Sequence, residues 1–177
     1  MLVEEDKKYV WHPFTQEKTA GANIPIVKGK DAWIIDADGN KYIDAISSWW
    51  VNIHGHCNAY MGKKISEQLQ EIEHVIFAGF THPKAVEIST RLIKKLGNKF
   101  HKVFFSDNGS TANEVALKMS FQYFYNQGNV KSKIIAFKDS YHGDTYGAMS
   151  VGGRSEFSKP FEENLFDVYH LDIPTEA

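Results

Sequence analysis

The stretch SDNGSTANEVALK (106–118) contains the residue types that bind an anion at the start of a helix. A strand ending near Ser106 would lead through the Gly109-Ser110 turn into a helix. The first amides of a helix have no acceptor within it and lie at the positive end of its dipole, so they favour a phosphate or carboxylate. The same residues are ordinary helix caps, with Glu114 near the position that a capping box requires. Local sequence therefore favours a plain cap and leaves an anion site as the alternative.

A second polar loop, DSYHGDTYGAMS (139–150), follows the next predicted strand. Open α/β sheets bind ligands at the carboxyl ends of their strands. We therefore expect this loop and the Gly109-Ser110 turn to converge on one edge of the sheet. Tyr141 could stack on a flat ring, and His142 could donate or accept a proton. An ordinary surface loop is the alternative.

Other catalytic patterns receive little support. His54 and His56 are suitable zinc ligands, but no carboxylate or further histidine stands at a recognisable ligand spacing, so loop histidines are the better interpretation. The glycine patterns of P-loops and dinucleotide-binding folds do not occur in the 177 residues, nor does the Gly-x-Ser-x-Gly of serine hydrolases.

Short β-rich runs follow an extended or loosely helical arm over residues 1–24. The Asp38-Gly39-Asn40 sequence between two of them is a hairpin signal, so a small meander is expected. The SSWW sequence (47–50) would place its two indoles on opposite sides of an extended backbone, in the core or in a pocket. The predicted strands cover residues 24–29, 32–39 and 41–47.

The remainder alternates helices and strands. Helical spacing predicts helices over 60–75, capped by Asn58, and over 83–96, followed by Gly97. A strand, helix and strand over 101–106, 110–128 and 132–140 then predict a parallel pair with a right-handed crossover.

These elements place the chain in the α/β class. Apolar residues on two faces of the helix over 110–128 predict that it is covered on both sides. Residues 157–174 are expected to be irregular. Two parallel strands cannot complete a doubly wound domain, so we expect a truncated chain.

Composition limits the partners. The net charge of -2 and the pI near 6.4 provide neither a basic stripe for nucleic acid nor a polybasic run for a membrane. The single cysteine, Cys57, excludes an intrachain disulfide and suggests a reducing compartment. No run of about 18 apolar residues occurs and the N-terminus lacks an apolar segment, so we expect a cytoplasmic protein without a signal peptide or membrane span.

Six motifs together carry a resemblance. From about Val10 to Leu165 the chain resembles the N-terminal part of the class III aminotransferases that depend on pyridoxal 5'-phosphate. The resemblance implies the α/β fold-type I architecture, with an N-terminal arm and part of the small domain over 1–57 and the first, incomplete part of the large, mostly parallel domain over 58–177. The motifs, in order, are WHPFTQ, ISSWWVNIHGH, HVIFAGFTH, FSDNGSTANEVALKMSFQYF, YHGDTYGAMSVGG and ENLF.

The resemblance also implies a cofactor site. Gly109 and Ser110 match the turn that holds the cofactor phosphate, and this favours the anion site over the plain cap. Tyr141 matches the aromatic residue that stacks on the pyridine ring, and His142 is expected at the cofactor edge.

Trp49 matches a tryptophan that lines the substrate pocket, and Phe14 stands where some members have a tyrosine. The biotin-pathway members are most similar, which implies transfer of an amino group to 8-amino-7-oxononanoate to give 7,8-diaminononanoate. S-adenosylmethionine is the expected donor and lysine the alternative. A homodimer is also implied.

The Schiff-base lysine of the family lies beyond this segment, and neither Lys133 nor Lys138 is assigned that role. No catalytic residue is therefore assigned, and the segment alone is expected to be inactive. The alternatives are another class III omega-aminotransferase and a binding module for a phosphate ligand without catalysis.

Overall fold

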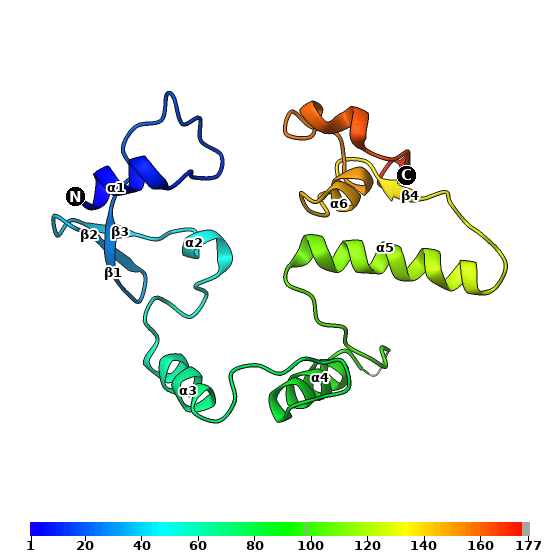
Figure 1. Ribbon diagram of the computed structural model, residues 1–177, viewed down its shortest axis with the longest axis horizontal. Coiled ribbons are helices and arrows are strands. Elements are labelled where there is room, and N and C mark those ends of the chain that lie inside the picture. Colours follow the sequence, from blue (N-terminus) through cyan, green and yellow to red (C-terminus); the bar gives the residue numbers. More distant parts are fainter. Residues whose placement is uncertain (98, 175–177) are drawn as a thin grey trace. The chain divides into compact units, whose positions relative to one another are not determined.

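The computed structural model describes residues 1–97 and 99–174. The chain divides into two compact units, Met1–His82 and Pro83–Ala177, which we treat separately. Figure 1 labels the helices and strands of each unit. No helix in the described ranges is both long and apolar enough to cross a membrane.

The first unit contains a three-stranded antiparallel sheet in the order β1-β2-β3. This confirms the predicted meander. Along the chain, α1 precedes β1, in the segment where an extended or loosely helical arm was expected. The helices α2 and α3 follow β3. The elements are α1 (Leu2–Tyr9), β1 (Ile26–Lys30), β2 (Trp33–Asp36), β3 (Lys41–Ile43), α2 (Ser47–Trp50) and α3 (Ala59–Leu69).

The hairpin between β2 and β3 is organised by one buried carboxylate. Asp36 accepts hydrogen bonds from the amides of Asp38 (3.0 Å) and Asn40 (2.8 Å), and from the Tyr42 hydroxyl (2.8 Å). Gly39 has a φ of 87°, a conformation that glycine adopts without steric cost. The Asp38-Gly39-Asn40 signal therefore marks the turn correctly.

The helix predicted over 60–75 ends early. Asn58 caps α3 as expected, because its side chain accepts a hydrogen bond from the Met61 amide (3.1 Å). The helix stops at Leu69, since the Gln70 amide bonds to the Glu67 carbonyl and tightens the last turn. The apolar spacing beyond this point belongs to loop residues.

The second unit alternates helices and short strands. Here α4 and α5 confirm the helices predicted over 83–96 and 110–128, and Gly97 follows α4 with a φ of 68°. The elements are α4 (Pro83–Lys95), α5 (Gly109–Asn126), β4 (Ile135–Phe137), α6 (Tyr146–Val151), the 3-10 helix η1 (Lys159–Asn164) and β5 (Tyr169–Leu171).

The parallel pair contains only one of the two predicted strands, since β4 lies within the strand predicted over 132–140. Residues 101–106 belong to neither described sheet, so the strand predicted there is wrong. Instead β4 pairs in parallel with β5, within residues 157–174 that were expected to be irregular. The apolar residues in 101–106 suit a strand, but a strand forms only beside a hydrogen-bonded neighbour. The described parallel neighbour of β4 is β5, and residues 101–106 have no strand partner in either described sheet.

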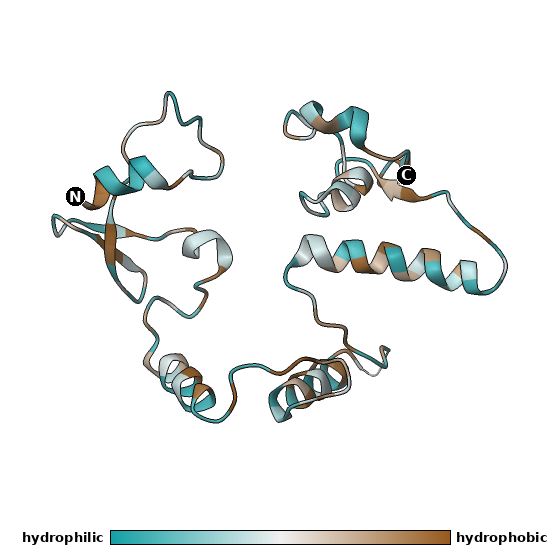
Figure 2. Cartoon of the chain, in the orientation of Figure 1, coloured by the Kyte–Doolittle hydropathy of each residue, from teal (hydrophilic) through white to brown (hydrophobic). Residues whose placement is uncertain are grey.

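Burial in this unit is concentrated in α6, where Gly147, Ala148, Ser150 and Val151 are buried. By contrast, α5 has no buried residue, and Figure 2 shows hydrophobic and hydrophilic residues interspersed along it. The prediction that α5 is covered on both sides is therefore wrong for the described residues. Its apolar faces have too few neighbours here to exclude water.

Candidate functional site

The N-terminus of α5 is closed by a capping box. The Thr111 amide donates to Asn108 Oδ1 (2.9 Å), and the Asn108 amide donates to Thr111 Oγ1 (3.1 Å). The box partner is therefore Thr111, not Glu114, because Thr111 occupies the third helical position and Glu114 lies a turn further on.

Capping leaves donors at the first two helical positions. The amides of Gly109 and Ser110 have no acceptor within the described part of the chain. The Ser110 hydroxyl accepts from the Asp144 amide (3.2 Å), so its own hydrogen remains available. Three donors thus converge at the positive end of an 18-residue helix. The plain cap is therefore present, and it leaves three other donors at the same helix end.

The loop at residues 141–145 lies directly against this helix end. Asn113 Nδ2 donates to the His142 carbonyl (2.6 Å), which ties the loop to α5. Gly143 has a φ of 128°, and a Cβ placed there would lie 2.7 Å from Ser110 Cα. Only glycine permits this approach. The turn and the loop therefore meet as expected, but not at a shared sheet edge, because residues 101–106 do not form the predicted strand.

Glu114 joins the two helices of the site. Its Oε1 accepts from Thr145 Oγ1 (2.6 Å), the Gly147 amide (2.7 Å) and the Ala148 amide (3.1 Å), so it caps α6 from the side of α5. The hydrogen bond from Thr145 is the main cause that lowers the pKa of Glu114 below its ordinary value of 4.5. Sequence analysis missed this role, because the bonding partners of Glu114 lie 31 to 34 residues away along the chain.

Tyr141 presents its ring to solvent, with 76% of the residue exposed. Its hydroxyl donates to Asp144 Oδ2 (2.7 Å), and this bond raises the pKa of Tyr141 above 10.0, so the hydroxyl stays protonated at neutral pH. The bond fixes the ring tip and leaves the ring face accessible. The structure thus brings Gly109, Ser110, Tyr141 and the His142 backbone into one cluster within the second unit.

The other two predicted site residues meet in the first unit. The rings of Phe14 and Trp49 are 5.4 Å apart with an interplanar angle of 47°, and those of Trp49 and Trp50 are 6.2 Å apart. The SSWW residues all have φ between 46° and 70°, a left-handed turn. The expectation of indoles on opposite sides of an extended backbone is therefore wrong. Residues beside one another in this turn contact edge to face.

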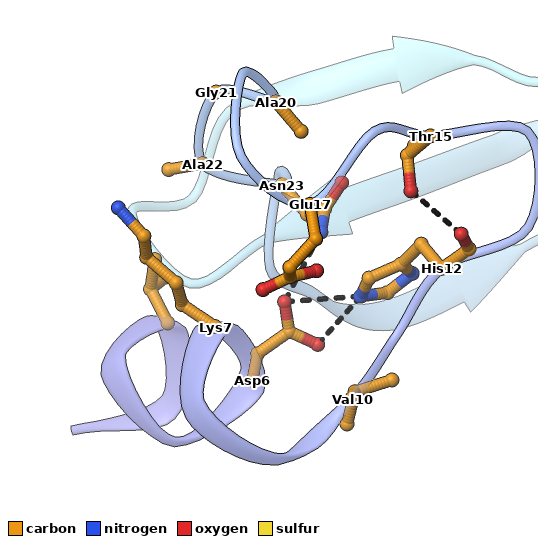
Figure 3. A pocket seen from close by; sticks show the side chains of 11 residues that line it. Asp6, Lys7, Val10, His12, Thr15, Glu17, Ala20, Gly21, Ala22 and Asn23 are labelled. Carbon is orange, nitrogen blue, oxygen red and sulfur yellow. Dashed lines mark hydrogen bonds and ion pairs between the residues drawn. The ribbon is translucent and has the colours of Figure 1, made fainter.

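Phe14 lies in the N-terminal arm between His12 and Thr15, which belong to a hydrogen-bonded cluster. Figure 3 shows His12 Nε2 directed at Asp6, with distances of 2.9 and 3.1 Å to its two carboxylate oxygens. Asn23 Nδ2 also donates to Asp6 (3.1 Å), and Thr15 Oγ1 donates to the His12 carbonyl (2.6 Å). The pocket among these side chains is about 20 Å³, room for roughly one water. The hydrogen bonds around it tie the residues of the arm together.

Comparisons with known proteins agree with these features. Residues 15–177 match the family model described as aminotransferase class-III. The adenosylmethionine-8-amino-7-oxononanoate aminotransferase of Synechococcus elongatus is 52% identical over 166 residues, which are 94% of this chain and 39% of that protein. The chain therefore spans about 39% of the length of the curated relatives that it matches first.

Solved structures give the same result. The aminotransferase of that name from Methanocaldococcus jannaschii superposes with a TM-score of 0.90 at 38% identity, covering 97% of this chain and 40% of that one. An omega transaminase from Pseudomonas jessenii in complex with PMP gives a TM-score of 0.89 at 27% identity, covering 98% and 39%. The chain belongs to the class III aminotransferases.

Proposed function

We propose that the complete protein is a pyridoxal-phosphate-dependent aminotransferase of biotin biosynthesis. It transfers an amino group to 8-amino-7-oxononanoate, with S-adenosylmethionine as the donor. The observation that carries the proposal is the helix end at Gly109 and Ser110, with three free donors beneath the loop at Gly143. The names of the relatives at 38–52% identity support the choice of substrates.

The donors fit the phosphate of the cofactor. A phosphate offers only acceptors at neutral pH, and the amides of Gly109 and Ser110 with the Ser110 hydroxyl offer only donors to it. Tyr141 offers an exposed ring face to the flat heterocycle, with His142 beside it at the cofactor edge. When bound, pyridoxal phosphate supplies the electron sink for amino transfer.

The residues of this chain bind and orient the cofactor and the substrate, and none of them is assigned a covalent step. Lys138 Nζ bonds to Asp172 (2.8 Å), and Lys133 Nζ lies 5.5 Å from the centre of the Tyr169 ring, so both amines are engaged elsewhere. Trp49 and Phe14 provide an apolar, aromatic wall that suits the aliphatic chain of the acceptor.

The proposal also includes the domain organisation, the oligomeric state and the cellular location of the protein. Residues 1–57 form the arm and part of the small domain, and 58–177 begin the large domain. Two copies associate as a homodimer, as the family resemblance implies, and the protein works in the cytoplasm. The lone Cys57 is consistent with a reducing compartment.

Removing single donors in the full-length protein tests the phosphate site. Gly109→Pro deletes one amide at the first helical position, where proline is favoured, and the extended Asn108 before it tolerates proline. Ser110→Ala deletes the hydroxyl. Each lost bond to a charged group contributes about 1.5–3 kcal/mol, so each variant should bind pyridoxal phosphate about 10-fold to 100-fold more weakly in titrations of the apoprotein.

The exposed Ser120 on the same helix provides the control, because its hydroxyl donates only to the Ala116 carbonyl. Ser120→Ala should retain full affinity. Pyridoxal without its phosphate should bind all four proteins equally. Unchanged affinity in both donor variants would disprove the phosphate site.

A different class III omega-aminotransferase is the second candidate, favoured by the likeness to the Pseudomonas jessenii enzyme. Phe14 also lacks the hydroxyl that a tyrosine would offer a donor substrate. Assays of the full-length protein with a panel of donors and acceptors separate the two candidates. Turnover of simple amines without turnover of 8-amino-7-oxononanoate would establish the second.

A further inference from the structure

Asp44 and His56 form a hydrogen-bonded carboxylate-imidazole pair next to the left-handed turn at residues 47–50. His56 Nε2 donates to Asp44 Oδ2 at 2.8 Å, since a carboxylate can only accept. The Asp44 side chain is 6% exposed and that of His56 17% exposed, so this pair is more buried than the other pairs of acidic and basic groups in the described chain.

Asp44 also holds the turn itself. Its Oδ1 accepts from the Ser48 amide (2.8 Å), and its Oδ2 accepts from the Ser48 hydroxyl (2.7 Å). Ser48 and the adjacent Trp49 have left-handed backbone angles, with φ of 46° and 62°. Such angles are unfavourable for residues other than glycine and persist only where the surroundings hold them.

His56 is in turn fixed from its backbone. Its amide and carbonyl both bond to Asp31, at 2.7 and 3.1 Å, which makes an isolated antiparallel bridge. A Cβ on Gly29 would lie 2.8 Å from His56 Cβ, so glycine at this position of β1 leaves room for the imidazole. The sheet therefore positions His56, His56 positions Asp44, and Asp44 positions the turn.

We infer that Asp44 and His56 are positioning residues for Trp49. They hold the turn in its left-handed conformation and so set the contact of Trp49 with Phe14, which determines the shape of the aromatic wall for the acceptor substrate. The inference rests on the proposed function for the role of that wall. The position of the turn can be measured without it.

The test uses circular dichroism of the full-length protein. Trp49 and Trp50 lie 6.2 Å apart at 64°, a geometry that couples their electronic transitions, so Trp49→Phe should remove an exciton couplet. In the Asp44→Ala variant the couplet should already be lost, so adding Trp49→Phe should not change the circular dichroism spectrum further. Asp44→Ala should also raise the KM for the acceptor about 10-fold and change kcat little. The reason is that the variant displaces a wall that binds the acceptor and leaves the reacting groups in place.

Asp36 provides the matched control. It lies buried in the same unit, with 5% of the residue exposed, and its side chain accepts hydrogen bonds only from within the β2-β3 hairpin. Asp36→Ala should keep the couplet and the KM. A retained couplet in Asp44→Ala, or an equal loss in Asp36→Ala, overturns the inference.

Two further outcomes are informative. Loss of the couplet with an unchanged KM supports the positioning of the turn and disproves the wall role of Trp49. If Asp44→Ala does not fold, Ser48→Ala replaces it, because that variant removes only the hydroxyl bond. It should weaken the couplet, and a couplet of full strength would count against the inference.

Discussion

Glu114 allows a quantitative test of how the candidate cofactor loop is held. The Glu114→Ala variant removes the acceptor for the Thr145 hydroxyl and for the amides of Gly147 and Ala148. The hydroxyl can rotate toward water, but both amides belong to buried residues. Each buried donor without a partner costs about 1–3 kcal/mol, and water entering the vacated space offsets part of this, so we expect a loss of about 3 kcal/mol.

A loss of this size should appear as local opening of α6. About 3 kcal/mol is a change of roughly 100-fold in the opening equilibrium, measurable as faster hydrogen exchange in residues 145–152 of the full-length protein. Alanine is itself a good helix former, so α5 should be unaffected. Glu114→Gln keeps an oxygen acceptor and should lose only about 1 kcal/mol.

The charge of Glu114 adds a pH dependence with a defined sign. Its pKa is lowered in the folded protein, so the ionised group stabilises the fold above the ordinary value of 4.5, and this contribution is lost as the pH falls below 4.5 through the folded pKa. Gln122→Ala on the exposed face of α5 is the control. If Glu114→Ala exchanges no faster than Gln122→Ala, Glu114 does not hold α6.

Two further predictions follow. Gly143→Ala should weaken the binding of pyridoxal phosphate to the full-length protein about 10-fold or more, because the new Cβ would overlap Ser110 and the φ of 128° suits only glycine; unchanged affinity in a titration would mean that the loop tolerates displacement. The Ser48 amide and hydroxyl, with His56, lower the pKa of Asp44 from 3.8 to about 2, so its stabilisation should be complete above pH 3.8 and lost as the pH falls toward 2. Urea midpoints of wild type and Asp44→Asn should converge over this range, and a constant difference would contradict the assignment.

Local signals predicted the elements whose ends carry their own caps. Proline at the start of α4 and Gly97 after it delimit that helix, and Asn108 with Thr111 delimits α5. The hairpin at Asp38-Gly39-Asn40 was predictable for the same reason. In each case, the groups that satisfy the backbone lie within a few residues of one another in sequence.

Features that depend on distant partners were not predictable. The apolar run at 101–106 looks like a strand but lies outside both described sheets, whereas β5 forms in a segment without a clear strand pattern because β4 lies beside it. Glu114 was assigned to the wrong helix end, since its partners are 31 to 34 residues away. The Asp44-His56 pair is likewise separated by 12 residues and gives no periodic signal.

The left-handed turn also restricts the ways in which Trp49 can change during evolution. At a φ of 62°, β-branched side chains are strongly disfavoured, so valine, isoleucine and threonine are poor replacements. Glycine at this position would remove the indole beside Phe14 and release about 1–2 kcal/mol of backbone cost at the same time. Among single replacements of Trp49, glycine should therefore be the one that relieves the backbone cost of the turn.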